Sequence, residues 1–97
     1  MKSVSVHPQA EADAEGAFDW YWTQSPLAAL RFHSELMSKL RTVPHASSSS
    51  PPHVHGTRRI LLHRFPYSIV FRELLHEIQI IAVAHAKRRP GYWAARL

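Results

Sequence analysis

The last third of the chain joins a short apolar run to a basic, aromatic end, and this junction limits the possible folds most. The run Ile78–Ala84 is short, apolar and rich in β-branched residues, which predicts an inner strand of a sheet. The segment His85–Arg96 follows at once and holds four Lys or Arg residues and two large aromatic ones. A buried strand that leads directly into such a segment is typical of a binding or reactive edge on a rigid support.

The charge of the chain is unevenly placed. Residues 58–97 contain eight Lys and Arg against two Glu, a net charge of +6, whereas residues 1–57 contain four against five acids, a net charge of −1. A basic half on a small domain indicates an anionic partner, which could be RNA, DNA or an acidic protein segment. A cationic surface that only keeps the protein in solution is the alternative, and the clustering favours a partner.

The composition excludes several classes of site. With 97 residues and no cysteine, we expect one domain over 1–97, without disulfides, Cys-based zinc sites or thiol chemistry. The N-terminus lacks the apolar run of a signal peptide and no stretch is long enough to span a membrane, so we expect a cytoplasmic protein. His53 and His55 are spaced as a chelating pair, but a Ser/Pro loop offers no further fixed ligands. We therefore predict no metal and no cofactor.

The first half of the chain predicts a short strand and two helices. Residues 3–6 alternate as an edge strand does. Pro8 and the acids after it suit a helix N-terminus, and apolar residues at helical spacing extend this helix over 8–23. Ser25 and Pro26 are a typical cap and first residue of a second helix over 26–42, which Pro44 is expected to end. The short link predicts an antiparallel helix hairpin.

The second half changes to the period of strands. Residues 44–57 contain four consecutive serines and read as a flexible loop. Strands are then predicted over 58–65, 67–73 and 77–84, as an antiparallel meander. The fold class is therefore α+β, with the helix hairpin on one face of a small sheet.

Strict alternation along the last two strands predicts which side chains share a face. Tyr67, Ile69 and Phe71 form the face assigned to the helices, and Ser68, Val70 and Arg72 form the other. On the last strand, Ile78, Ile80, Ala82 and Ala84 share one face, and Gln79, Ile81, Val83 and His85 share the opposite one. If the helices cover one side only, Arg72 and His85 both project from the open side, near the cations of the tail.

The order of elements and several sequence blocks resemble the RelE/ParE superfamily of toxins from bacterial type II toxin–antitoxin systems. The blocks are Phe18–Trp22 with Ser25-Pro26, Val54–Arg59, Arg64–Arg72, Ala82–His85, and Arg89–Trp93 with Arg96. The resemblance covers nearly the whole chain. It implies a growth inhibitor that a small antitoxin neutralises through a disordered segment that folds on binding. It also implies that the pair represses its own operon, with operator DNA contacted only through the antitoxin.

The resemblance leaves two targets open. RelE-like members are endoribonucleases that cut mRNA in the ribosomal decoding site, whereas ParE-like members are not hydrolases and poison DNA gyrase. For a nuclease, the resemblance implies that Arg72 and Arg89 stabilise the phosphorane, His85 transfers a proton and Tyr92 orients or donates. Trp93 would then stack on a base.

The region 45–60 contains none of the lysines or the glutamate that such nucleases use there, so we favour the gyrase inhibitor. This reading needs a basic, shaped surface and tail rather than a complete catalytic set. The residues predicted to contact the target are Arg58, Arg59, Arg64, Lys87, Arg88, Trp93 and Arg96. For Trp20 and Trp22 we expect core packing or contact with the antitoxin.

Overall fold

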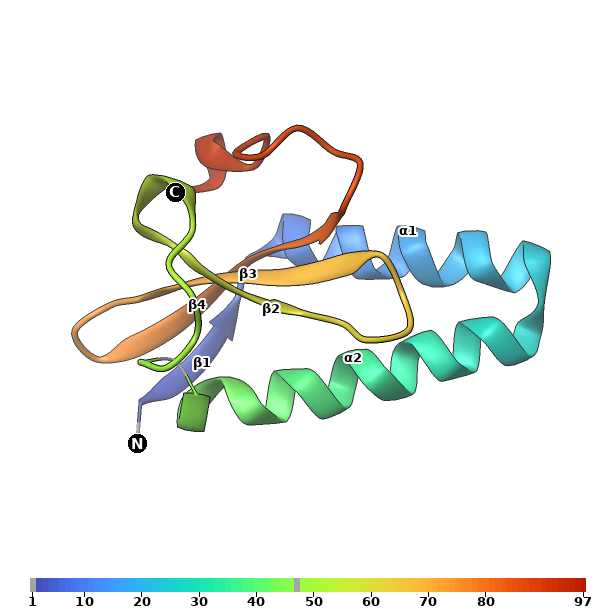
Figure 1. Cartoon of the computed structure of the whole chain (residues 1–97), viewed down its shortest axis with the longest axis horizontal. Coiled ribbons are helices and arrows are strands. Elements are labelled where there is room, and N and C mark those ends of the chain that lie inside the picture. The colour runs from blue at the N-terminus through green and yellow to red at the C-terminus, as the bar shows by residue number, and fades with distance from the viewer. Residues whose placement is uncertain (1, 47) are drawn as a thin grey trace.

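The computed structural model of the chain describes residues 2–46 and 48–97. Its elements are β1 (Ser3–Val6), α1 (Pro8–Gln24), α2 (Pro26–Ala46), β2 (Arg58–Leu61), β3 (Tyr67–Glu73) and β4 (Glu77–His85), with short 3₁₀ turns at Val54–Gly56 and Ala94–Arg96. The four strands form one sheet in the order β1-β4-β3-β2. β1 runs parallel to β4, and the other two pairings are antiparallel. The predicted α+β fold with a helix hairpin and a meander is confirmed (Figure 1).

The helix hairpin forms where the capping residues predicted it. The hydroxyl of Ser25 accepts a hydrogen bond from the amide of Ala28 at 3.3 Å, and Pro26 opens α2. These contacts satisfy amide groups that a helix N-terminus would otherwise leave unpaired. α1 begins at Pro8 after His7, whose ring Nδ1 accepts from the amide of Gln9 at 3.0 Å. The two helices therefore start and turn back at sites that the sequence encodes locally.

The second helix continues beyond Pro44 to Ala46, so the predicted end at residue 42 is wrong. Val43 is completely buried, and its packing holds this turn of the helix against the core. The carbonyl of Ala46 accepts hydrogen bonds from the amides and hydroxyls of Ser49 and Ser50. The packing of Val43 and the hydrogen bonds to Ala46 together stabilise the last turn of α2, although Pro44 disfavours a helix at this point.

The strand β2 ends at Leu61 rather than at residue 65 as predicted. The carboxylate of Glu35 on α2 accepts hydrogen bonds from the amides of His63 and Arg64. These amides therefore point toward the helix instead of joining a ladder. Glu35 thus caps the turn between β2 and β3 and ties it to α2.

The main core lies between the helix hairpin and one face of the sheet. The helices contribute Ala10, Ala17, Phe32, Leu36 and Val43, and the strands contribute Ile69, Phe71, Ile78, Ile80 and Val83. All of these side chains are buried. The helix positions are those at which the sequence placed apolar residues at steps of three and four, so burial of this face explains both helices.

A β-bulge in β4 changes which residues share a face. Val70 of β3 lies opposite Ala82, but the next residue, Phe71, lies opposite Ile80, so Ile81 is an extra residue in β4. Ile80 and Val83 therefore both pack on the helix side, whereas Ala82 and Ala84 lie on the other face. The predicted alternation is wrong after Ile80 because one inserted residue inverts the period of two.

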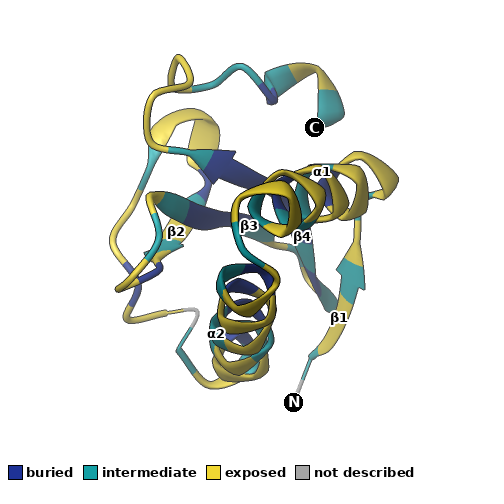
Figure 2. Cartoon of the chain, turned by 90° about the vertical axis from the view of Figure 1, so that its right-hand side faces the viewer, coloured by how far each residue is buried: buried dark blue, intermediate teal, exposed yellow. Residues whose placement is uncertain are grey.

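The face of the sheet away from the helices is also covered. Trp93 is 1% exposed and packs there with Val70, Ile81, Ala82 and Ala84. In Figure 1 the C-terminal segment, in red, lies across the strands from α2, and Figure 2 shows buried and intermediate residues within this segment. The expectation of an open face beside the helices is wrong, since the tail forms a third layer.

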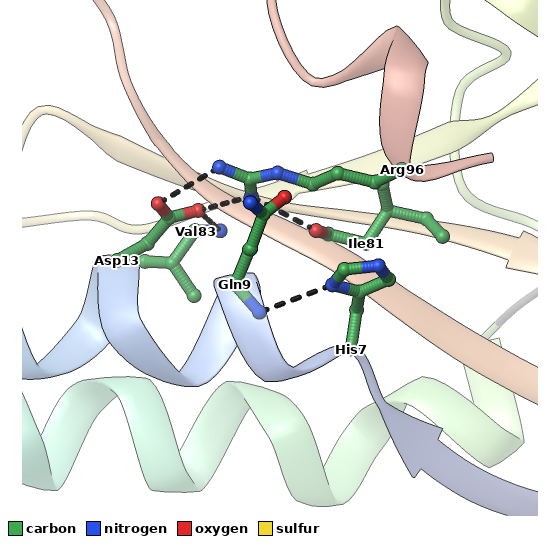
Figure 3. Close-up of polar contacts among 6 residues, drawn as sticks. All are labelled: His7, Gln9, Asp13, Ile81, Val83 and Arg96. Carbon is green, nitrogen blue, oxygen red and sulfur yellow. Dashed lines mark hydrogen bonds and ion pairs between the residues drawn. The ribbon is translucent and has the colours of Figure 1, made fainter.

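Asp13 and Arg96 anchor this tail at the edge of β4 (Figure 3). The guanidinium of Arg96 donates to both carboxylate oxygens of Asp13, at 2.6 and 3.2 Å, and to the carbonyl of Ile81 at 3.1 Å. Asp13 also accepts from the amide of Val83 at 3.1 Å. β1 pairs with β4 only as far as Ile80, so these side chains satisfy backbone groups that no strand covers.

The loop before β2 packs against the same tail. In its described part, Pro52 forms a bridge with Arg58, and Ser50 and Thr57 are buried. The rings of His53 and His55 each lie 5.9 Å from that of Trp93. Tertiary contact with the tail therefore gives residues 48–57 more structure than their Ser/Pro composition predicts.

Removal of the tail anchor is expected to destabilise the fold. Asp13→Ala removes the acceptor of the Val83 amide and two of the hydrogen bonds of the Arg96 guanidinium. These groups lose stabilisation because the ion pair is largely shielded from water. We expect a loss of about 2 kcal/mol in the free energy of unfolding, measured by urea denaturation. A double-mutant cycle with Arg96→Ala should give a coupling energy of about 1–2 kcal/mol.

The exposed pair Lys2–Glu73 is the matched control for this cycle. Its side chains are 34% and 36% exposed, against 12% and 18% for Arg96 and Asp13. Because water screens such a pair, Lys2→Ala should change the free energy of unfolding by about 0–1 kcal/mol. Equal losses for Lys2→Ala and Asp13→Ala would contradict the role assigned to the anchor.

Candidate functional site

A small cationic cavity lies between the sheet and the C-terminal tail. We call it the tail cavity; its lining residues are His53, Arg59, Ser68, Ala84, His85, Ala86, Arg88, Arg89, Pro90, Tyr92 and Trp93. Its volume is about 50 Å³, more than the 10–15 Å³ or so that one water molecule needs. No Asp or Glu is among these lining residues. The cavity therefore concentrates positive charge in a concave site.

Strands β2, β3 and β4 supply the floor of the tail cavity. Arg59 on β2 pairs with Val70 on β3, and Ser68 on β3 pairs with Ala84 on β4, so these side chains share the face that the tail covers. Ser68 is 7% exposed. Alternation along 67–73 predicted Ser68 on the face away from the helices, but no sequence motif marked it as a site residue. Only the covering tail turns this serine into part of a cavity wall.

The tail supplies the roof. The guanidinium carbon of Arg88 lies 3.9 Å from the ring centroid of Tyr92, and that of Arg96 lies 5.4 Å from it. Burial raises the pKa of Tyr92, and the nearby Asp13 carboxylate raises it further. Tyr92 therefore stays a neutral hydrogen-bond donor over the physiological range. The hydrogen bond to Asp13 is also the largest cause that raises the pKa of Arg96, so this residue stays charged.

His53 forms the wall on the side of the loop. Burial lowers the pKa of His53, and the neighbouring charges of Arg59 and His55 lower it further. Sequence reasoning considered this residue only as a metal ligand. Among residues 2–46 and 48–97, no group of three His, Cys, Asp or Glu side chains is placed to hold a metal ion. In the folded chain, His53 instead packs on Trp93.

The structure separates two of the four residues predicted for RNA cleavage. His85 lies opposite Tyr67, with 4.9 Å between the ring centroids, and Tyr67 packs on the helix side. Arg72 lies near the other end of β3, where its Nε donates to the side chain of Gln79 at 2.9 Å. About 16 Å of strand separates the two positions. The prediction that both project from one open face is wrong, because the tail packs on that face.

His85 has a visible structural role. Its ring Nδ1 accepts a hydrogen bond from the amide of Lys87 at 3.0 Å, which caps the turn after β4. His85 also lines the tail cavity, together with the predicted residues Arg89 and Tyr92. The roles of all four in catalysis stay predictions, but the fold brings only part of the set together.

The residues predicted to contact a target also divide into groups. Arg59 and Arg88 line the tail cavity, and Lys87 is exposed in the turn beside it. Trp93 is buried and Arg96 is bound to Asp13, so neither presents its side chain to a partner. Arg58 donates to the carbonyl of Ser50, and Arg64 lies beside Glu35 in a separate hollow next to α2.

A second concave surface lies between the two helices. We call it the hairpin groove; it is lined by Glu11, Ala14, Glu15, Phe18, Asp19, Leu30, Phe32, His33, Leu36 and Met37, and its volume is about 630 Å³. Trp20 and Trp22, farther along α1, are 57% and 50% exposed, so packing in the core is excluded for both. Phe18 and Trp22 stack with ring centroids 5.9 Å apart. The hairpin thus carries exposed apolar surface with acids along one wall.

The described residues include no helix that is both long and apolar enough to cross a membrane.

Comparison with known proteins identifies the family. The model of the ParE toxin of type II toxin–antitoxin systems, parDE, matches residues 4–90. The chain belongs to this ParE toxin family. A solved structure of the chromosomal ParDE TA system from P. aeruginosa is similar to this ParE-family chain, with 25% identity and a TM-score of 0.80. The similarity covers 90% of this chain and 98% of that one. No curated protein matches.

The position of His53 predicts a pH dependence of stability for this ParE-family chain. Its pKa is lowered on folding, so the unfolded chain takes up a proton near pH 6.5 while the folded chain resists it. The stability that the neutral ring contributes is complete above about pH 6.5 and is lost as the pH falls through the folded-state pKa. We expect the free energy of unfolding to decrease from pH 7 to pH 5, and to decrease less in His53→Gln.

His76→Gln, in the exposed turn between β3 and β4, is the control for this experiment. It should keep the pH dependence of the unmodified chain, as measured by thermal or urea unfolding at each pH. A His53→Gln variant whose stability falls as steeply on acidification as that of the unmodified chain would refute the assignment.

Proposed function

We propose that this chain is the toxin of a type II toxin–antitoxin pair and that it inhibits growth by poisoning DNA gyrase in the bacterial cytoplasm. The match to the ParE toxin family over residues 4–90 is the observation that carries the proposal. The similar solved structure is that of a ParDE TA system. Both comparisons favour the ParE-like side of the superfamily over the RelE-like side.

The geometry of the site supports an inhibitor that does not hydrolyse RNA. A general acid or base must lie within hydrogen-bond reach of the reacting group, in the same pose as the residues that stabilise its charge. His85 lies opposite Tyr67 at one end of β3, and Arg72 lies near the other end, about 16 Å of strand away. A single scissile phosphate could not contact both of them in this fold.

The surface around the tail cavity supports a target that contains DNA. Lys87, Arg88 and Arg89 are exposed in consecutive positions after β4, and Arg59 lies across the cavity from them. Gyrase acts on a DNA duplex, so its complex offers phosphate groups beside protein surfaces. A rigid cationic edge of this kind suits a complex of gyrase and DNA, because it can contact DNA phosphates and the gyrase surface at the same time.

A supercoiling assay tests this function. Incubation of the purified chain with gyrase and relaxed plasmid should inhibit supercoiling, and detergent and protease treatment should release linear DNA from trapped cleavage complexes. The double variant Lys87→Glu/Arg89→Glu should need about tenfold more protein for the same inhibition, because it reverses two charges beside the cavity. Arg31→Glu/Arg41→Glu, on the exposed surface of α2, makes the same change in net charge as a control and should inhibit normally.

A parallel assay with translating ribosomes separates the alternative target. We expect the mRNA to remain intact at concentrations of the chain that inhibit gyrase. Cleavage of mRNA in the decoding site, with supercoiling unaffected, would overturn the proposal and return Arg72, His85, Arg89 and Tyr92 to consideration as a catalytic set.

We also propose that the antitoxin covers the hairpin groove. The groove has a mainly apolar floor, and one wall carries Glu11, Glu15 and Asp19 at steps of four residues along α1. An amphipathic helix with basic residues on its flank matches this pattern, since its apolar side fills the floor and its cations face the acids. The partner segment expected here is therefore basic, whereas the charge of the second half of the chain suggested an acidic one.

Leu30→Asp tests the groove. Leu30 is 55% exposed on its wall, so an aspartate should leave the fold intact but weaken antitoxin binding at least tenfold, because it places a charge in the apolar interface. Binding can be measured by calorimetry with the antitoxin encoded beside this gene. Leu75→Asp, at a position 81% exposed in the β3–β4 turn, should bind normally. Unchanged affinity for Leu30→Asp would place the antitoxin elsewhere.

A further inference from the structure

The tail cavity gathers three arginine side chains, those of Arg59, Arg88 and Arg89. Within residues 2–46 and 48–97, the guanidinium groups of Arg59 and Arg89 form no hydrogen bond or ion pair. Exposed arginines elsewhere in that part of the chain also lack such partners, but these two lie together in a concave site. No carboxylate lines the cavity. Guanidinium groups gathered in a concave site without a counterion favour an anion as ligand.

Ser68 lines the same cavity from the sheet. Its side chain is 7% exposed, and no hydrogen bond to its hydroxyl occurs within the described residues. The hydroxyl still reaches solvent, because among the described residues only the hydroxyl of Ser5 is both fully buried and without a partner. It is therefore available to a ligand that enters the cavity. A serine hydroxyl can donate one hydrogen bond to an anion, from the floor opposite Arg88 and Arg89 on the tail.

The size and shape of the cavity select the kind of anion. A volume of about 50 Å³ leaves room for a compact group and excludes a nucleobase. Planar guanidinium groups match the oxygens of a phosphate in a two-pronged geometry. We propose that the tail cavity binds one phosphate group of a nucleic-acid strand, held by Arg59, Arg88, Arg89 and the hydroxyl of Ser68.

The aromatic residues of the tail do not read bases in this arrangement. Trp93 is 1% exposed under the tail, and the ring of Tyr92 already contacts two guanidinium groups. Stacking on a base, as predicted for Trp93 from sequence, is therefore wrong for this fold. Recognition through phosphate alone makes binding independent of base sequence and strongly dependent on salt.

Direct binding tests the site without gyrase. Fluorescence anisotropy of labelled DNA and RNA 12-mers of equal sequence, with the full-length chain at low salt, should show binding to at least one of them. Arg59→Gln and Arg89→Gln should each weaken this binding by about tenfold and reduce the dependence of log Kd on log salt by about one unit. Ser68→Ala should weaken it severalfold with no change in net charge. The strand bound more tightly identifies the source of the phosphate.

Arg41→Gln, an exposed cation on α2, is the matched control and should alter the affinity less than twofold. If Arg41→Gln and Arg59→Gln weakened nucleic-acid binding equally, the attraction would be a general effect of net charge. That result would overturn the proposed phosphate site. Unaltered affinity in Ser68→Ala, or no binding of either strand at low salt, would overturn it as well. Nucleic-acid binding that depends on these residues but occurs without gyrase inhibition would refute the proposed function and leave the phosphate site standing.

Discussion

The contact between Asp13 and Arg96 determines how the two ends of the chain are organised around the sheet. One carboxylate on α1 binds the last arginine of the chain and an amide of β4, and the same arginine binds a carbonyl of β4. These bonds replace the hydrogen bonds that a longer β1 would make. Because the pair is largely shielded from water, each partner needs the other to offset the cost of its burial. The tail, the edge of β4 and the first helix are therefore positioned by a single interaction.

The β-bulge at Ile81 makes this arrangement possible. An uninterrupted period of two would have placed Ile78, Ile80, Ala82 and Ala84 together under the helices. The extra residue instead directs Val83 to the helices and leaves the small residues Ala82 and Ala84 on the opposite face. Small side chains there leave space for the indole of Trp93, whose packing holds the basic tail against the sheet. The tail cavity is a consequence of this packing, since its floor belongs to β2, β3 and β4 and its roof to the tail.

The fold places its cationic cavity and its acidic groove on different surfaces. The cationic cavity lies on the tail side of the sheet, whereas the hairpin groove with its acidic wall lies on the helices. Two partners of opposite charge can thus be accommodated on different surfaces. An antitoxin bound at the groove would contact the helices directly, and its effect on the cationic edge would then depend on how far its chain extends around the molecule.

Local signals in the sequence determined the helices of this protein: the cap at Ser25 and Pro26 and the spacing of apolar residues on both helices are encoded within a few residues. The sequence also determined that the cations gather at the C-terminal end, and its motifs identified the superfamily. Only the tertiary structure decided the end of α2 beyond Pro44, the bulge, the burial of Trp93 and the pairing of Asp13 with Arg96. Each of these joins residues that are distant in the chain or depends on one residue shifting the register, and neither periodicity nor propensity contains that information.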